Sequence, residues 1–167
     1  MCQDAAPQFI CALNRECSAE VGLVAARMGE TLVEVLGAER AQAVYSEAEI
    51  LQRLLWHLDR APERLAEVFV AVDEQQRITA HTIVRVEREE QQTCGLFATT
   101  FVSPPFRRLG LAEQLLAAGE AWMTSAGMGE AATYTDVGNT PLQELYLKRG
   151  YHKTVVDEEW LRLSRTL

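Results

Sequence analysis

The chain has 167 residues, of which 48% are apolar, and its 24 acidic and 16 basic side chains give a formal net charge of -8. This composition is typical of a folded domain, and the length suits one domain that buries its core without disulfides or metals. The negative charge argues against a nucleic-acid backbone or an anionic membrane as the main partner, because both require a concentrated positive surface. It is compatible with a cationic or neutral substrate.

The four cysteines stand at positions 2, 11, 17 and 94 and form no C-x-x-C pair or zinc-like spacing with histidine. Neither a zinc site nor a redox motif is therefore expected. The N-terminal sequence lacks a basic region followed by an apolar core, and no window reaches 18 uncharged apolar residues. We expect one cytoplasmic domain over residues 1–167, with no metal, nucleic acid or membrane as partner. The sequence leaves open whether the chain forms a homodimer.

The first third of the chain predicts a short strand and two helices. The strand is expected over residues 8–13, and Ser18 is expected to cap a helix that ends at Gly37. A second helix is expected from Ser46, which begins a capping box, to the break at Pro62. The apolar face of the first helix consists of Val21, Val24, Ala25, Met28, Leu32, Val35 and Leu36.

From residue 67 the spacing of the apolar residues changes from that of a helix to that of strands. Short turns separate these strands, which predicts an antiparallel meander. Its three strands are expected at 68–72, 78–86 and 94–102. The elements that follow are a helix over 109–126, a strand over 131–137, a short helix over 141–149 and strands near 151–156 and 160–165. This order predicts an α/β layer with a mixed sheet.

The stretch from Val102 to Ala112 contains most of the recognisable chemistry. An uncharged strand ends there, Arg107 and Arg108 form a basic loop, and a long helix begins with Gly110 in its first turn. Free N–H groups at a helix N-terminus, the positive end of the helix dipole and a glycine together suit a pyrophosphate. The stretch therefore predicts an anion site. A plain turn with two solvated arginines is the alternative.

The spacing V-x-P-x-x-R-x-x-G-x-A in this stretch resembles the acyl-CoA pyrophosphate motif of the GNAT acetyltransferase superfamily. By that resemblance the main chain would hold the pyrophosphate at Arg108, Leu109, Gly110, Leu111, Ala112 and Glu113, beside Arg107. The end of the preceding strand would pair with the pantetheine arm through backbone groups of Thr100, Phe101 and Val102. Acetyl-CoA is the implied co-substrate.

A second match, N-x6-Y-x3-G-Y, is formed by Asn139, Tyr146, Gly150 and Tyr151. It resembles the cofactor asparagine, the helix tyrosine and the closing Gly-aromatic pair of the same family. Thr140 is expected to cap the short helix that carries the tyrosine. An ordinary core aromatic is the alternative role for Tyr146.

The resemblance is clearest over residues 68–151. It implies a GNAT-like fold of the α/β (α+β) class, with a mixed, mostly antiparallel central sheet and helices on both faces. Residues 68–167 would form the acyl-CoA-binding core, and the helices of residues 18–61 would border the acceptor site.

The implied reaction is direct transfer of an acetyl group from acetyl-CoA to a primary amine within a ternary complex. Tyr146 is the expected proton donor to the departing thiolate, because a phenol has a reference pKa near that of a thiol. Tyr134 stands where some relatives carry a glutamate. Asp136 is the candidate base, acting through water, although it also suits binding of a cationic amine or a plain strand end.

The sequence thus predicts an N-acetyltransferase for a small amine, an aminoglycoside-like polyamine or a peptide or protein amine. A catalytically silent acyl-CoA-binding or sensing module is the alternative. The isolated histidines predict no metal role, Cys94 is expected to be an inert buried thiol, and the acidic runs at 87–90 and 157–159 are expected to be solvated turns. Four side chains are candidates to line the acceptor pocket, although each also suits an amphipathic helix or a loop anchor. They are Glu30, Glu34, Tyr45 and Trp56.

Overall fold

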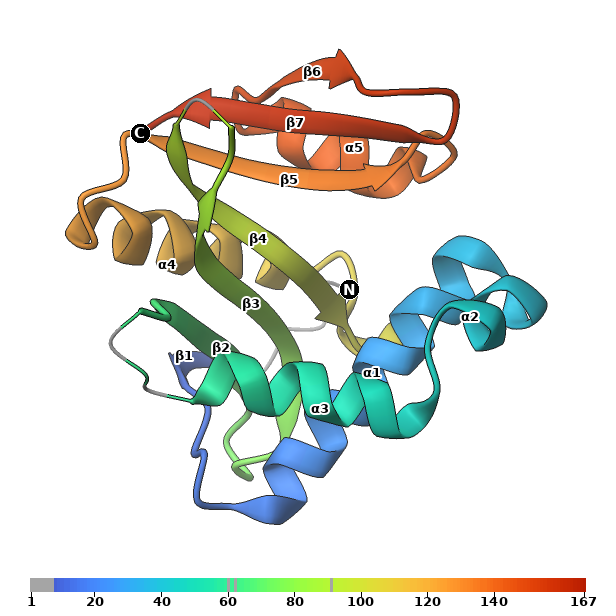
Figure 1. Cartoon of the computed structure of the whole chain (residues 1–167). Helices are drawn as coiled ribbons and strands as arrows, with labels where there is room; N and C mark the ends of the chain where they lie inside the picture. Colours follow the sequence, from blue (N-terminus) through green and yellow to red (C-terminus); the bar gives the residue numbers. More distant parts are fainter. Residues whose placement is uncertain (1–7, 60, 62, 91) are drawn as a thin grey trace, which may run out of the picture.

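Seven strands form one sheet in the order β1-β2-β3-β4-β5-β7-β6 in the computed structural model, which describes residues 8–59, 61, 63–90 and 92–167 (Figure 1). Every neighbouring pair is antiparallel except β4 and β5, so the predicted mixed, mostly antiparallel sheet is confirmed. The strands are β1 (Phe9–Ala12), β2 (Ala66–Val72), β3 (Ile78–Arg88), β4 (Thr93–Val102), β5 (Glu130–Asp136), β6 (His152–Val155) and β7 (Trp160–Thr166).

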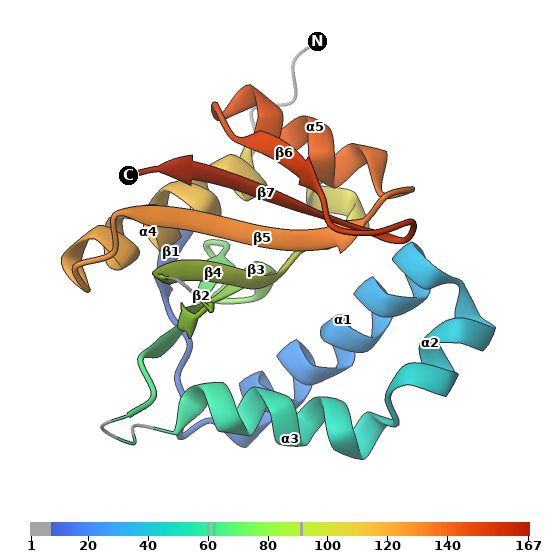
Figure 2. The ribbon, with the colours of Figure 1, turned by 45° about the horizontal axis from the view of Figure 1, so that its top comes forward.

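Helices cover both faces of the sheet, as predicted. The first three helices gather on one face, and α5 lies over the other (Figure 2). Among the described residues, no helix has the length and apolarity needed to cross a bilayer. The helices are α1 (Ser18–Leu36), α2 (Ala38–Val44), α3 (Glu47–Leu58), α4 (Leu111–Ser125) and α5 (Thr140–Lys148), with a 3-10 turn, η1, at Pro104–Phe106.

The alternation of side chains along β2 separates two cores. Val70 and Val72 pack with α1 and α3, whereas Ala71 between them packs with Leu111 and Leu115 of α4. This is the period of two expected of a strand that is buried on both sides. The helix α4 therefore lies on the opposite side of the sheet from α1 and α3.

A glycine allows α4 to lie close against β4. A Cβ atom at Gly119 would fall 2.4 Å from the ring of Phe97, closer than real Cβ contacts allow. Leu116 and Met123 of α4 then share a core with Phe97 and with Tyr146 of α5. This packing fixes the start of α4 relative to the end of β4, where the sequence predicts the anion site.

Two features of the first helices differ from the prediction. The N-cap of α1 is Cys17, without a side-chain cap bond, so the prediction of Ser18 as the cap is wrong. The residues between Gly37 and Ser46 form an additional helix, α2. The capping box of Ser46 and Glu49 is confirmed, and α3 ends at Leu58. The expected break at Pro62 lies outside the described residues.

Candidate active site

The strands β4 and β5 pair over a short distance and then separate. Their parallel pairing covers Gly95–Phe97 on β4 and Ala131–Thr133 on β5. Beyond these pairs β4 continues along β3 to Val102, and β5 continues along β7 to Asp136. Ala98 is an extra residue in the β3–β4 register and forms a bulge where the separation begins. The facing edges of the two strands are left without a strand partner, which opens the middle of the sheet.

A cavity of about 210 Å³ occupies this opening. Its walls come from the separating parts of β4 and β5, from α5, and from the sides of α1 and α3 that face the sheet. A larger hollow of about 760 Å³ lies among α1, α2 and α3 and shares Leu32, Tyr45 and Ile50 with the cavity. The predicted catalytic and cofactor-binding residues that line the cavity are Thr100, Asp136, Asn139 and Tyr146.

Tyr146 lies at the inner end of the opening and is 1% exposed. Its ring meets Phe97 and Tyr151 edge-on, with centroids 5.8 Å and 4.8 Å away. Burial raises the pKa of its hydroxyl above the usual value, although hydrogen bonding to Thr133 and Thr100 acts in the opposite direction. The phenol therefore stays protonated at neutral pH and can donate a proton.

The loop before α4 has two residues in the left-handed region. Arg108 has a φ of 66° and Gly110 a φ of 77°, and Gly110 is the N-cap of α4. The helix begins at Leu111 rather than at Leu109 as predicted. The first backbone N–H that turns back into the helix is that of Gln114, which donates to the carbonyl oxygen of Gly110. The preceding amides are the free donors of a helix N-terminus.

The space beside these amides is open. A Cβ atom built at Gly110 would meet no heavy atom within 4 Å. The side chains of Leu109 and Glu113 are exposed, whereas Leu111 is buried in the core under α4, so it offers only its main chain to a ligand. Ala112 is half-buried.

The two predicted loop arginines have different surroundings. Arg107 donates through Nε to the carbonyl oxygen of Val102 at 2.8 Å and pairs with Glu34 of α1 at 2.6 Å. It therefore ties the end of β4 to α1. Arg108 is exposed and makes no ion pair within the described part of the chain. Of the two, Arg108 is the one whose charge is available to an anion at the α4 N-terminus.

Asn139 serves the backbone of α5. Its side-chain oxygen accepts the N–H of Leu142 at 3.4 Å, and its amide donates to the hydroxyl of Thr135 at 3.1 Å. Asn139 is the N-cap and Thr140 is already helical, so the prediction of Thr140 as the cap is wrong. The cap keeps the start of α5, and with it Tyr146, in a fixed position.

Asp136 ends β5 at the mouth of the cavity. Its Oδ1 accepts the backbone N–H of Gly138 at 2.7 Å, and its Oδ2 lies 4.0 Å from Arg40 of α2. Phe101, by contrast, does not line the cavity: its ring stacks on His81 of β3 and lies 5.8 Å from the guanidinium of Arg27 of α1. Thr100 and Val102 bracket it on the strand, so the predicted pantetheine segment is continuous in backbone but alternates in side-chain direction.

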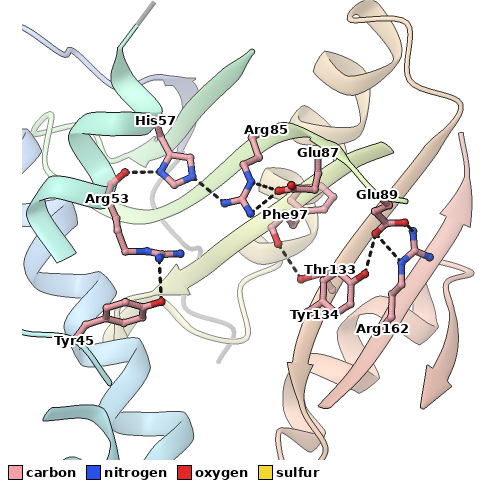
Figure 3. Close-up of polar contacts among 10 residues, drawn as sticks. All are labelled: Tyr45, Arg53, His57, Arg85, Glu87, Glu89, Phe97, Thr133, Tyr134 and Arg162. Carbon is pink, nitrogen blue, oxygen red and sulfur yellow. Dashed lines mark hydrogen bonds and ion pairs between the residues drawn. The ribbon is translucent and has the colours of Figure 1, made fainter. Parts of the chain in front are cut away.

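The α3 wall contains residues to which the sequence analysis gave no pocket role. His57 lies in the cavity wall between Arg53 and Arg85, and its Nδ1 is 2.7 Å from the carbonyl oxygen of Arg53 (Figure 3). Burial lowers the pKa of His57 to about 4, so its imidazole is neutral at physiological pH. The helical spacing of His57 from Leu54 and Leu58 was the available signal that this side chain faces inward.

On the opposite side in Figure 3, Tyr134 of β5 donates its hydroxyl to Glu89 at 2.9 Å. Glu89 also pairs with Arg162 of β7. The expectation that the acidic run at 87–90 is only a solvated turn is therefore wrong for Glu89, because its carboxylate fixes a residue of the cavity wall.

The same Arg162 accounts for a cluster of metal-type ligands. Oxygen or sulfur atoms of Glu89, Cys94 and Glu130 lie within 4.8 Å of one another, and Arg162 pairs with both carboxylates. Burial raises the pKa of the Cys94 thiol to about 11, which makes it a poor nucleophile.

The predicted acceptor-side residues divide between two places. Glu30 and Glu34 line the larger hollow, and Tyr45 lines both the hollow and the cavity. Trp56 lines neither of these two, and the guanidinium of Arg64 lies 5.2 Å from its ring. Because Glu34 is paired with Arg107, Glu30 is the α1 carboxylate that gives the hollow a negative side.

The opening between two parallel strands, the helix N-terminus beside it and the buried phenol within it agree with an acyl-CoA-dependent N-acetyltransferase. The chain belongs to the acetyltransferase (GNAT) family, whose sequence profile matches residues 26–151.

A relative of characterised activity matches only part of the chain. It is the aminoglycoside N(6')-acetyltransferase type 1 of Salmonella typhimurium, which is 41% identical over 54 residues, or 32% of this chain. The match spans 37% of the length of that relative.

Solved structures share the fold over nearly the whole chain. The PaiA N-acetyltransferase of Thermoplasma acidophilum in complex with coenzyme A has a TM-score of 0.74 and 14% identity, and the match covers 96% of this chain and 99% of that one. A chain of the NatC complex bound to Gag peptide and CoA has a TM-score of 0.71 and 17% identity, with coverage of 96% and 98%. At these low sequence identities the similarity to the two structures shows the fold alone.

Proposed function

We propose that this protein is an N-acetyltransferase that transfers the acetyl group of acetyl-CoA directly to a primary amine in a ternary complex. The observation that carries the proposal is the position of Tyr146, whose protonated hydroxyl lies in the cavity where β4 and β5 separate. Family membership over residues 26–151 agrees with this activity.

The described residues fit an acyl-CoA. The free amides from Arg108 to Glu113 suit the pyrophosphate, because helix N-terminal N–H groups and the helix dipole favour an anion. The open space at Gly110 leaves the main chain accessible, and Arg108 adds an exposed positive charge. The unpaired edge of β4 from Thr100 to Val102 suits a ligand with amide groups. Asn139 supports the site by capping α5.

When bound, acetyl-CoA supplies the activated acetyl group and the thiol leaving group. The neutral amine nitrogen forms a bond to the carbonyl carbon as the carbon–sulfur bond breaks. Tyr146 donates its proton to the sulfur, the amine nitrogen loses one proton to water, and Tyr146 regains a proton from water, so that the products are the amide and the free thiol. The bulge takes Ala98 out of the β3–β4 register, and its backbone is the candidate donor to the carbonyl oxygen. Asp136 has two candidate roles, as proton acceptor through water or as binder of a cationic amine.

We further propose that the acceptor is cationic. Glu30 lines the hollow beside the cavity, where Glu34 is paired with Arg107, and Asp136 stands at the cavity mouth with Arg40 4.0 Å away. The partial relative is named as an acetyltransferase of aminoglycosides, which agrees with a cationic acceptor. The proposal of a cytoplasmic setting rests on the sequence alone.

Release of free thiol from acetyl-CoA, measured against a panel of amines, tests the proposal. The panel contains a monoamine, a diamine, an aminoglycoside and a peptide with a free N-terminus. Amine-dependent thiol release is expected from the wild-type chain, with a much slower rate from Tyr146→Phe. Tight CoA binding without thiol release for any amine would instead favour the alternative, a catalytically silent acyl-CoA-binding module.

A further inference from the structure

One face of the β5–β7 ribbon presents two aromatic rings on either side of a carboxylate. Tyr134 and Asp136 are two residues apart on β5 and so point to the same face. Trp160 of β7 is the direct antiparallel partner of Asp136, which places its side chain on that face too. All three line the cavity, and the two rings are 41% and 39% exposed.

A hydrogen bond from its hydroxyl fixes the position of Tyr134. Its hydroxyl donates to Glu89, which is fixed in turn by Arg162, the partner of Tyr134 across the ribbon. The hydroxyl is therefore occupied, while the ring remains part of the cavity wall. Aromatic faces beside a carboxylate are the usual means of binding an alkylammonium group.

A cation of the protein itself already lies at this carboxylate. Arg40 of α2 is 4.0 Å from Asp136 and 3.7 Å from Glu159, and its side chain is 55% exposed. Because Arg40 is itself exposed and lies at the distance limit of an ion pair with Asp136, the pair contributes only about 0–1 kcal/mol, so another cation can replace the guanidinium. Arg40 therefore acts as a weak, displaceable occupant.

The same carboxylate lies apart from the hydroxyl of Tyr146. The hydroxyl of Tyr146 lies beside Thr133, and Asp136 is three residues further along β5. At about 3.3 Å per residue this separation is about 10 Å, which suits a second ammonium group of a long acceptor better than the amine that reacts beside Tyr146.

The α3 side of the cavity presents Arg53 and His57, neither of which attracts a cation. Arg53 of α3 places its guanidinium over the ring of Tyr45, 4.6 Å from the centroid, and donates to the hydroxyl of that ring. His57 beside it is neutral because burial lowers its pKa. An ammonium group is therefore directed toward the β5–β7 wall.

We infer that Tyr134, Asp136 and Trp160 form a subsite for the second, non-reacting ammonium group of a polyamine acceptor, and that Arg40 fills this subsite when no acceptor is bound. The inference rests on the proposed acetyltransferase activity. It assigns Asp136 to acceptor binding rather than to proton transfer.

The test compares acetylation of 1,5-diaminopentane and 1-aminopentane. The wild-type chain is expected to show a KM for the diamine about tenfold below that for the monoamine, which is the effect of one ammonium–carboxylate contact of about 1.4 kcal/mol. Asp136→Asn, which can still accept the N–H of Gly138, is expected to raise the diamine KM about tenfold while kcat falls less than about twofold. Arg40→Ala is expected to lower the diamine KM.

Glu158→Gln is the matched control, because it removes one negative charge from an exposed position close to Trp160 and outside the cavity wall. Its diamine KM should equal that of the wild type. A fall in kcat for both amines in Asp136→Asn, with a shifted pH profile, would overturn the inference by making Asp136 the base. Equal KM values for the two amines in the wild-type chain would also overturn it.

Failure of the proposed activity is distinguishable from failure of this subsite. If no amine is acetylated, calorimetric titration of 1,5-diaminopentane into the protein with saturating CoA replaces the kinetics. Binding that weakens in Asp136→Asn and tightens in Arg40→Ala supports the subsite without turnover. No difference among the three proteins contradicts it.

Discussion

The rings of Tyr146 and Tyr151 meet edge-on with centroids 4.8 Å apart, but their hydroxyls have different partners. The hydroxyl of Tyr151 donates to Glu120 of α4 at 3.0 Å. The hydroxyl of Tyr146 turns instead toward Thr133 and Thr100 at the opening of the sheet. Two adjacent buried phenols thus have separate tasks, one in holding α4 and one in the cavity.

The first prediction uses this pair. Tyr146→Phe is expected to lower kcat for amine acetylation by about 100-fold, since it removes the general acid, while the Kd for CoA stays within about twofold. Tyr151→Phe is the control, because it removes a neighbouring buried hydroxyl that does not line the cavity. Equal rates for the two variants in a steady-state thiol-release assay would show that Tyr146 is only a core aromatic.

The second prediction concerns the ion pairs of α4. Glu120 is buried and binds Arg149, Arg165 and Tyr151. Glu120→Ala is expected to lower the free energy of unfolding by about 3 kcal/mol, because it leaves the buried Tyr151 hydroxyl and the half-buried guanidinium of Arg149 without their acceptor. Urea denaturation measures this loss.

Glu144→Ala serves as the control for that experiment, since Glu144 is exposed on α5. Its free energy of unfolding should stay within about 0.5 kcal/mol of the wild-type value. A comparable loss in both variants would mean that the contacts of Glu120 contribute no more to the free energy of unfolding than an exposed carboxylate does.

The third prediction is a loss of stability in mild acid. Burial lowers the pKa of His57 to about 4 and of His81 to about 3, below the unfolded value near 6.5. Below pH 6.5 the unfolded chain therefore takes up protons that the folded imidazoles do not. Each histidine is expected to cost up to about 1.4 kcal/mol of stability per pH unit from about 6.5 down to its folded pKa.

His81→Leu isolates one of these contributions. His81 is fully buried, and neither of its ring nitrogens has a hydrogen-bond partner among the described residues. The variant should show a shallower decline of unfolding free energy between pH 6.5 and 5 in urea titrations. His152→Gln, at an exposed position on β6, should keep the wild-type slope. An unchanged slope in His81→Leu would contradict the assignment.

Much of the fold follows from local pattern. The alternation in 68–72, 78–86 and 94–102 predicted β2, β3 and β4 as an antiparallel meander, and the structure confirms it. The Ser46 capping box and Gly37, which has a positive φ of 78°, also set helix ends where the sequence predicts them. These features depend on residues close in sequence, which is why they are readable.

Features that depend on distant partners were not readable. The helix α2 has one buried residue, Ala41, so its seven residues carry almost no apolar period. The bond of Arg107 to Glu34 joins segments 73 positions apart. The placement of His57 in the cavity wall and of Arg40 near Asp136 likewise depends on how α1–α3 pack across the sheet. Contacts between residues so far apart in the sequence leave no local pattern that predicts them.

The central claim is that the N-terminus of α4 holds the pyrophosphate of acyl-CoA, and Gly110 is the residue that tests it. Its φ of 77° is unfavourable for any other residue, so both Gly110→Ala and Gly110→Glu pay a conformational cost of about 1–2 kcal/mol. Only the glutamate adds a negative charge beside the free amides. The comparison of the two variants therefore separates backbone strain from charge.

Calorimetric titration of CoA into the wild type and both variants is the most direct measurement. The account predicts that Gly110→Glu weakens CoA binding at least about tenfold more than Gly110→Ala, while both remain folded by circular dichroism. Equal CoA affinity in the two variants would contradict the assignment of the pyrophosphate to the start of α4.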